Sequence, residues 1–332
     1  GLIVAMDALG DDERGDVPAE EGDPVATTDG AVTPATSTAT ASVVEGTWIV
    51  GLDGSECATN ALDWVTANVA DRGTAITLVS AWQTPVVGAY PMSTTVTVPY
   101  DESELRDAAA HDAAEVARTV GERVTVPVTA SVGHGGPAQV LLEASESAAL
   151  LVIGSRGRGG FARLLLGSTS TQCATHASVP TIVVPADAEP TPVERILVGC
   201  DGSPNSMLAL RWAIEFAAPG STVVVVWVWD ATPLAVGADA FFFPDASDLA
   251  AERFHHLVDT VADLADDRRV KLQREFVRGT PRSALAEHAE HADLVVLGAR
   301  GHGAVGAALL GSVSTWMLHH VHRPIAVVPI AH

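Results

Sequence analysis

Residues 150–168 read LLVIGSRGRGGFARLLLGS, and residues 294–312 read LVVLGARGHGAVGAALLGS. Each stretch begins with an apolar run and continues with the pattern Gly-x2-Gly-x9-Gly-Ser. The two copies lie 144 positions apart (Gly154 to Gly298), a spacing that suits a whole domain and is far too long for a solenoid repeat. The pattern therefore predicts a tandem duplication in which each copy carries a glycine-rich loop after a buried strand.

The rest of the chain repeats in the same order. Residues 48–55 (WIVGLDGS) correspond to residues 196–203 (ILVGCDGS), and residues 179–185 (VPTIVVP) correspond to residues 323–329 (RPIAVVP). Short, continuous apolar runs alternate with segments of helical periodicity, which is typical of a parallel sheet covered by helices on both faces. The predicted helices are 57–69, 102–120, 137–148, 168–176, 205–217, 246–265, 281–291 and 312–320.

This alternation predicts an α/β protein with two doubly wound parallel-sheet domains, residues 47–187 and 194–330. Residues 6–46 hold ten acids and one base, so we predict that residues 1–46 form a disordered acidic tail rich in Thr and Ala. In such sheets ligands bind at the carboxyl ends of the strands.

Charge and composition limit the partners of the chain. Its 41 acidic and 19 basic residues give a net charge of −22, which argues against binding nucleic acid or anionic membranes. No apolar run approaches the ~20 residues that span a bilayer. The three cysteines lack metal-ligand spacing, so we expect reduced thiols in a cytoplasmic protein.

The glycine-rich loops have the properties of an anion site. Gly154 and Gly157 can adopt positive φ and expose their N–H groups, while Gly167-Ser168 begins a helix whose first amides and dipole attract anions. The alternative is a tight strand-to-helix connection that needs glycine for steric reasons alone. Positive charge within the loops comes from Arg156, Arg158 and Arg300.

Two familiar nucleotide motifs do not fit these loops. A Walker A loop contains Gly-Lys-[Ser/Thr], and neither loop contains lysine. Residues 301–306 (GHGAVG) match the dinucleotide pattern, but that fingerprint follows the first strand and has an acid about 20 residues on. Neither residues 154–186 nor residues 298–332 contain Asp or Glu. The sequence therefore excludes a P-loop NTPase and a dehydrogenase.

An acid is available instead at the end of the first strand of each repeat, at Asp53 and Asp201. The ends of the first and fourth strands flank the crevice of a doubly wound sheet. A carboxylate facing a glycine-rich anion site predicts a mononucleotide pocket, with the base and ribose at the first strand and the phosphates at the fourth. The alternative role for these acids is a helix N-cap or an Asx-turn, and the two roles can coexist.

Together these motifs resemble the ATP-binding branch of the universal stress protein family: Gly-x2-Gly-x9-Gly-[Ser/Thr], a first strand ending Val-Gly-x-Asp-Gly-Ser, and a last strand reading Val-Val-Pro. The resemblance covers about residues 47–330, in two consecutive copies. It implies an adenine nucleotide alpha-hydrolase-like fold that binds ATP, alone or with Mg²⁺. Two positions depart from the family pattern: Ala81 stands where a larger residue is usual, and His302 replaces a basic or polar residue.

The resemblance also implies site residues. Asp53 and Asp201 would contact the ribose and adenine region, and the backbone at Ala81 and Val228 would meet the base. The first phosphate site would be lined by Gly154, Gly157, Gly167, Ser168 and Ser170, and the second by Gly298, Gly301, Gly311, Ser312 and Ser314.

Family members pair through their last strand. The strands at 181–184 and 325–328 would therefore join the two repeats as a pseudo-dimer, and we expect a homo-oligomer. Two long loops, residues 85–99 and 233–244, follow the second strand of each repeat and could form lids over the base or oligomer contacts.

Three functions compete at this point. We expect an ATP-binding regulatory module of the stress response, with no catalytic residues and no metal held by the protein alone. The alternatives are a slow ATP hydrolase and a nucleotide-independent adaptor. Histidines gather in the second repeat, and His288 with His291 has i,i+3 spacing, but we expect helix histidines there rather than a metal site.

Overall fold

The computed structural model describes residues 45–69, 72–83, 101–157, 166–230, 245–301 and 310–330. They belong to one compact unit, residues 41–332. The predicted acidic tail lies outside the described residues except for its last two positions. The two predicted lid loops lie outside them as well.

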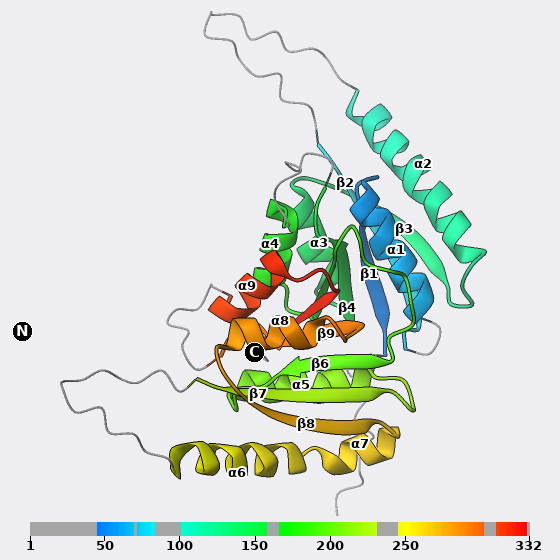
Figure 1. The fold of residues 1–332 in the computed structure, drawn as a ribbon. Helices are drawn as coiled ribbons and strands as arrows, with labels where there is room; N and C mark the ends of the chain where they lie inside the picture. The colour runs from blue at the N-terminus through cyan, green and yellow to red at the C-terminus, as the bar shows by residue number, and fades with distance from the viewer. Residues whose placement is uncertain are drawn as a thin grey trace, which may run out of the picture. The chain divides into compact units, whose positions relative to one another are not determined.

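The first repeat alternates strands and helices in the predicted order (Figure 1). Its strands are β1 (Thr47–Leu52), β2 (Ala75–Trp82), β3 (Val128–His134), β4 (Leu150–Gly154) and β5 (Thr181–Val184). Its helices are α1 (Glu56–Asn68), α2 (Glu102–Gly121), α3 (Pro137–Ser145) and α4 (Ser168–His176).

The second repeat follows the same plan with one helix more. Its strands are β6 (Arg195–Gly199), β7 (Thr222–Trp229), β8 (Lys271–Arg278), β9 (Leu294–Gly298) and β10 (Ile325–Val328). Its helices are α5 (Pro204–Phe216), α6 (Asp245–Asp259), α7 (Ala262–Arg268), α8 (Pro281–Ala289) and α9 (Ser312–His320).

The prediction of a single helix over 246–265 is wrong, because α6 ends at Asp259 and α7 begins at Ala262. The Thr260 hydroxyl donates to the Leu257 carbonyl at 2.6 Å, and Val261 has φ −118° and is buried. Val261 is the N-cap residue of α7, so it and Thr260 lie between the two helices. Spacing of apolar residues alone does not show such a break.

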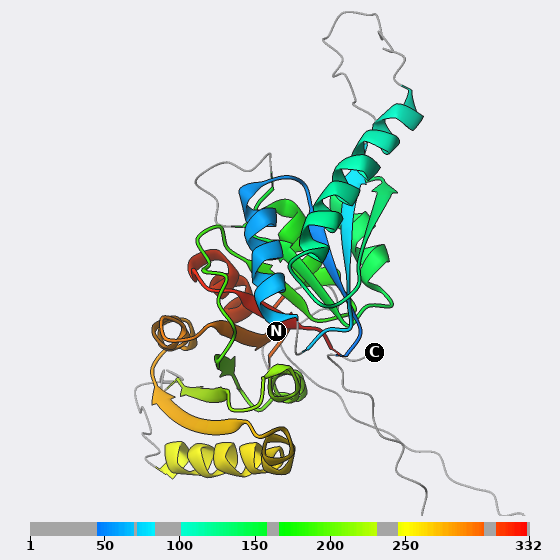
Figure 2. The same ribbon diagram turned by 90° about the vertical axis from the view of Figure 1, so that its right-hand side faces the viewer.

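The strands form one continuous sheet in the order β3-β2-β1-β4-β5-β10-β9-β6-β7-β8 (Figures 1 and 2). Within each repeat the strand pairs are parallel, which confirms the predicted doubly wound α/β class. Between the repeats β5 and β10 pair antiparallel, with Ile182 opposite Ala326. The two repeats therefore share a single sheet, and the strands expected to join them lie at its centre.

Helices cover both faces of the sheet, and side chains of each strand alternate between two core layers. Along β1, Trp48 and Val50 belong to the layer under α1 and α5, whereas Ile49 belongs to the layer under α3 and α4. Each layer contains residues of both repeats. The apolar strands at the centre of the sheet are thus buried on both sides, as parallel sheets require.

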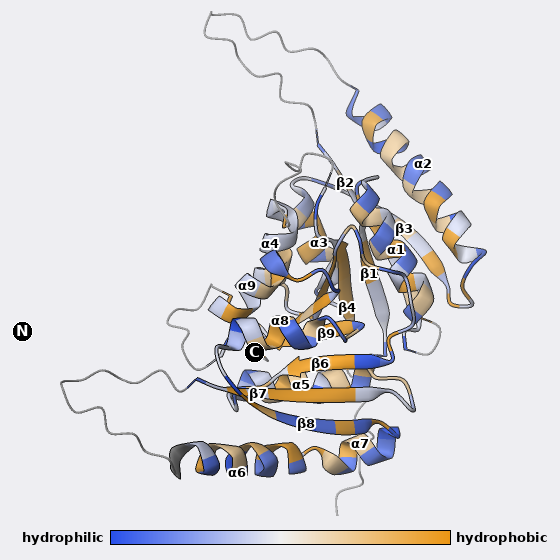
Figure 3. Ribbon diagram, viewed as in Figure 1, coloured by the Kyte–Doolittle hydropathy of each residue, from blue (hydrophilic) through white to orange (hydrophobic). Residues whose placement is uncertain are grey.

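The two edge strands differ from this pattern. β3 and β8 contain no fully buried residue, and β8 carries the polar residues Lys271, Gln273, Arg274 and Glu275 (Figure 3). The expectation that every strand is a buried apolar run is wrong at these edges. Charged edge strands are a common protection against pairing with other chains.

Candidate functional site

In each repeat the turn after the first strand lies beside the loop after the fourth strand. β1 pairs with β4, with Val50 opposite Val152, so Asp53 and Gly154 lie at the same edge of the sheet. β6 pairs with β9 in the same register, with Val198 opposite Val296. The structure therefore brings the predicted acid and the predicted glycine loop together twice.

The acid belongs to a tight Asp-Gly-Ser turn. The Ser55 N–H donates to Asp53 Oδ1 at 2.9 Å, and the Ser55 hydroxyl caps α1 by accepting from the Ala58 N–H at 3.2 Å. Gly54 has φ +72°, a conformation that favours glycine. The Asx-turn role is therefore present, and the serine rather than the aspartate caps the helix. The second repeat is the same, with Ser203 N–H donating to Asp201 Oδ1 at 2.9 Å.

The second carboxylate oxygen lies against the glycine loop. A Cβ placed on Gly157 would be 2.5 Å from Asp53 Oδ2, and one placed on Gly301 would be 2.3 Å from Asp201 Oδ2. No side chain fits at these loop positions while the carboxylate stays in place. The acid and the loop are thus in closer contact than the sequence predicted.

The first loop glycine is needed for contact, not for its φ angle. Gly154 and Gly157 do not adopt positive φ, so this predicted reason for them is wrong, and Gly298 and Gly301 of the second repeat do not adopt it either. A Cβ on Gly154 would lie 2.5 Å from the backbone carbonyl carbon of Cys57. Glycine at this position lets the end of β4 approach the first turn of α1. This is the steric role of glycine that the sequence left open as an alternative.

The helices after the loops begin without a side-chain cap. Gly167 and Gly311 are the N-cap residues of α4 and α9, and neither helix has a side-chain cap hydrogen bond. Each N-cap amide instead closes its loop, with Gly167 N–H donating to the Ser155 carbonyl at 2.8 Å and Gly311 N–H to the Ala299 carbonyl at 2.7 Å. Orphan first-turn amides and the helix dipole at such a terminus favour an anion.

The predicted serines divide into an exposed and a buried pair. Ser168 and Ser312 are exposed at the helix starts, where a ligand can reach them. Ser170 is buried, and its hydroxyl bonds to the carbonyls of Gly154 and Ser155, both at 2.9 Å. Ser314 likewise donates to the Gly298 carbonyl at 2.8 Å. The buried pair therefore fastens the helix to the strand end.

The predicted base contacts lie one strand further along the sheet edge. Leu52 is opposite Ser80, so Ala81 of β2 is level with Asp53, and Val228 of β7 is level with Asp201. Both residues are half-buried. Their backbone lies on the side of the acid that faces away from the glycine loop, because β1 separates β2 from β4.

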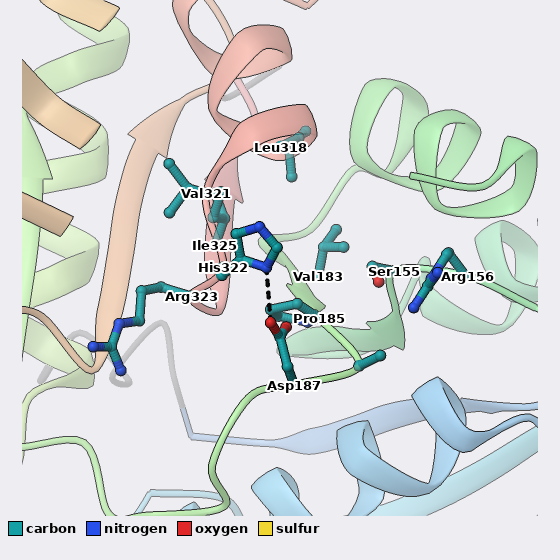
Figure 4. Close-up of a pocket in the computed structure, with 11 residues that line it drawn as sticks. Ser155, Arg156, Val183, Pro185, Asp187, Leu318, Val321, His322, Arg323 and Ile325 are labelled. Atoms are coloured by element: carbon teal, nitrogen blue, oxygen red, sulfur yellow. Dashed lines mark hydrogen bonds and ion pairs between the residues drawn. The ribbon is translucent and has the colours of Figure 1, made fainter. Parts of the chain in front are cut away.

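The loop arginines differ between the repeats. The Arg156 carbonyl accepts from the Ser55 hydroxyl at 3.3 Å, and the Arg300 carbonyl accepts from Asn205 Nδ2 at 3.2 Å. The Arg156 side chain is among the residues that line a pocket between the repeats (Figure 4). Two further predicted loop residues, Arg158 and His302, lie outside the described residues.

That pocket, which we call the junction pocket, was not predicted. It has a volume of about 160 Å³ and lies where β5 and β10 meet. It is lined by Ser155, Arg156, Val183, Pro185, Ala186, Asp187, Leu318, Val321, His322, Arg323 and Ile325. In the sequence, two short runs beside the joining strands mark this pocket. Pro185-Ala186-Asp187 follows β5, and His322-Arg323 comes shortly before β10.

The histidines and cysteines do not form a metal site in the described part of the chain, where no group of three ligands is found. His288 instead bonds to the Ala284 carbonyl at 2.7 Å and pairs with Glu275 at 2.8 Å. All three cysteines are free and buried, and burial raises the pKa of the Cys173 thiol to about 12. A thiol of that pKa is not a nucleophile near neutral pH.

Both repeats resemble one known protein family. The model of the Universal stress protein family matches residues 47–185 and again residues 192–329. The chain belongs to the universal stress protein family, as a tandem member with two domains. Among the described residues no helix is long and apolar enough to cross a membrane.

Its relatives share this tandem form. A universal stress protein of Mycolicibacterium smegmatis is 32% identical over 289 residues, which cover 84% of this chain and 96% of the relative. One from Mycobacterium tuberculosis is 31% identical over 287 residues, which cover 84% and 95%. A solved universal stress protein of Archaeoglobus fulgidus has a TM-score of 0.60 at 19% identity and covers 87% of this chain and 99% of its own. The structural match concerns the fold alone.

Proposed function

We propose that this tandem universal stress protein binds ATP at the sheet edge of each repeat and acts as a nucleotide-dependent regulatory module. The observation that carries the proposal is the same in both repeats: an uncapped helix start, a glycine loop and a carboxylate converge at the ends of the first and fourth strands. Under this proposal the protein is cytoplasmic, and its response to nucleotide is read by another protein or by a second copy.

The position of the carboxylate defines how ATP would sit. Phosphates would be held by the first-turn amides of α4 and α9 with Ser168 and Ser312, whose hydroxyls are exposed. Asp53 and Asp201 would accept hydrogen bonds from the ribose hydroxyls, because a carboxylate repels phosphate unless a cation lies between them. Mg²⁺ would suit a position between one of these carboxylates and a phosphate, since it prefers carboxylate, phosphate and water oxygens.

Binding, and not turnover, is the expected activity. The site offers backbone amides and serine hydroxyls, which stabilise bound phosphates in the ground state as well as in a transition state. The described part of each glycine loop contains no acid that could orient water at a terminal phosphate. We therefore expect turnover far below the ~1–100 s⁻¹ of kinases. Rapid ADP release would instead favour the ATP hydrolase alternative.

A charge placed at the helix start tests where the phosphates bind. Ser168→Asp with Ser312→Asp adds a carboxylate where the dipole favours it, so α4 and α9 should keep or gain about 0.5 kcal/mol of stability. The same carboxylates would repel phosphate, and we expect ATP affinity to fall at least ~10-fold by calorimetry. The control is Gln172→Asp with Thr315→Asp, which adds equal charge at exposed positions one turn further along the helices.

The wild-type protein gives the primary test. Mass spectrometry should find co-purified adenine nucleotide, and ATP at 100 times its Kd should stabilise the fold by about 2.7 kcal/mol. GTP should stabilise it less. An unchanged melting temperature in millimolar ATP with magnesium would contradict nucleotide binding and support the adaptor alternative.

A further inference from the structure

The junction pocket has an apolar floor and a polar rim (Figure 4). The floor comes from both repeats, because Val183 belongs to β5, Ile325 to β10, and Leu318 and Val321 to the end of α9 and the residue after it. Its volume of about 160 Å³ is close to that of an engineered cavity of ~150 Å³ that takes up benzene. The pocket can therefore hold a body of about six carbon atoms.

The rim carries positive charge in a chain whose net charge is −22. Its two arginines, Arg156 and Arg323, outnumber its single acid, Asp187. Among the described residues the Arg156 guanidinium has no hydrogen bond or ion pair, whereas Arg323 donates to the Glu290 carbonyl at 2.7 Å. An arginine without a carboxylate partner beside an apolar floor is suited to an anionic group.

The one acid of the rim is loosely held. His322 Nδ1 lies 2.8 Å from Asp187 Oδ2, but their side chains are 57% and 59% exposed. Exposed pairs of this kind contribute little to stability. A ligand carboxylate or phosphate could replace Asp187 beside the imidazole at small cost.

The His322-Arg323 pair and the larger apolar side chains occur on only one side of the junction. By repeat alignment His322-Arg323 corresponds to Ser178-Val179, and Leu318 and Val321 correspond to Ala174 and Ala177. Arg156 has a counterpart in Arg300, but the related surface on the other side of the β5–β10 pair lacks the His-Arg pair and the larger floor side chains. Duplication of the fold alone does not account for the pocket.

We propose that the junction pocket is a second binding site, for a small organic anion with one carboxylate or phosphate group on a short apolar body. The anionic group lies between Arg156 and His322, and the body contacts Val183, Leu318, Val321 and Ile325. This site differs from the proposed nucleotide site, although Ser155 and Arg156 of its lining belong to the first glycine loop. A ligand there touches both repeats at once and so stabilises their junction.

Four probes separate the parts of the proposal. Methyl resonances of Leu318, Val321, Val183 and Ile325 are followed while valerate, butyl phosphate, pentanol or inorganic phosphate is added up to ~20 mM to the full chain. We expect saturable shifts with valerate and butyl phosphate, and weaker ones with the other two. Comparison of valerate with butyl phosphate shows which head group is preferred. Equal shifts with pentanol, or no shifts with any probe, would overturn the proposal.

Variants assign the charges. Asp187→Asn removes the competing carboxylate and should tighten binding of the preferred probe at least ~3-fold, whereas Arg156→Gln should weaken it ~10-fold. Arg211→Gln makes the same charge change at an exposed position of α5 and should leave the affinity unchanged. Weaker binding in Asp187→Asn would contradict the arrangement. If ATP alone produced the same methyl shifts, the pocket would be part of the nucleotide site and the inference would be wrong.

Discussion

At the scale of single residues, the Asp53 carboxylate and the Gly157 backbone depend on each other. Gly157→Ala places a Cβ where Asp53 Oδ2 now lies, so the carboxylate has to rotate away from a turn in which Ser55 N–H holds it. In an Asp53→Ala background there is nothing to displace. We expect a coupling free energy of about 1 kcal/mol between the two substitutions, measured by urea unfolding of the four proteins of the cycle.

Gly154→Ala is the matched comparison. Its Cβ meets the backbone of Cys57 at 2.5 Å, and backbone cannot rotate away as a carboxylate can. We expect a loss of at least ~2 kcal/mol that Asp53→Ala does not relieve. Additive behaviour of Gly157→Ala with Asp53→Ala would show that the carboxylate moves freely and that the contact has no consequence.

The sequence identified these residues but not the reasons for them. Spacing and context selected Asp53 and Gly154 as neighbours at the sheet edge, and the strand order places them there. Whether a glycine is needed for its φ angle or for contact depends on what packs against it. Gly54 and Gly202 have positive φ while Gly154 and Gly157 do not, and only coordinates distinguish the two cases.

At the scale of elements, α1 and α5 bury aromatic rings between the repeats. Phe216 of α5 stacks near Trp48 of β1 at 6.0 Å and near Trp64 of α1 at 6.2 Å. Arg72 lies over the Phe216 ring, 4.9 Å from its centre, and its Nε donates to the Phe216 carbonyl at 2.8 Å. This contact joins the repeats on one face of the sheet.

Truncating Phe216 should loosen the repeats from each other. Phe216→Ala should cost about 3–5 kcal/mol and make urea transitions followed by tryptophan fluorescence and by circular dichroism diverge. Phe254→Ala is the control, because Phe254 is equally buried and its ring packs near Trp227 and Phe276 of the second repeat. It should lower stability while the two transitions still coincide. Coincident transitions in Phe216→Ala would show that this contact does not couple the repeats.

Element positions were largely predictable, whereas contacts between elements were not. The bounds of α4 and α9 agree with the predicted 168–176 and 312–320, because Gly-Ser marks the start of each helix. The aromatic contact and the junction pocket join residues from both repeats. Aligning the two repeats shows which positions are equivalent, but it does not show which residues of one repeat touch the other. The Arg72 side chain is an example, since its partner Phe216 lies 144 positions further along the chain.

At the scale of the whole molecule, the order of the strands determines which part opens last. β5 and β10 are central and buried at every residue, while the edge strands β3 and β8 contain no fully buried residue. Separating the repeats would break the β5–β10 ladder and expose both core layers, each of which contains residues of both repeats. The junction should therefore open only when the whole sheet unfolds.

Hydrogen exchange measures this directly. Amides of β5 and β10 should exchange slowest, with a free energy equal to that of global unfolding, and amides of β3 and β8 should exchange through local opening. Exchange in β1 and β6 provides the comparison within the same protein. Both are buried strands, and each pairs only with strands of its own repeat. If peptides covering 181–184 and 325–328 exchanged faster than those covering β1 and β6, the repeats would come apart before either unfolded. The continuous sheet would then be two domains in contact, and a ligand in the junction pocket would slow exchange at that contact first.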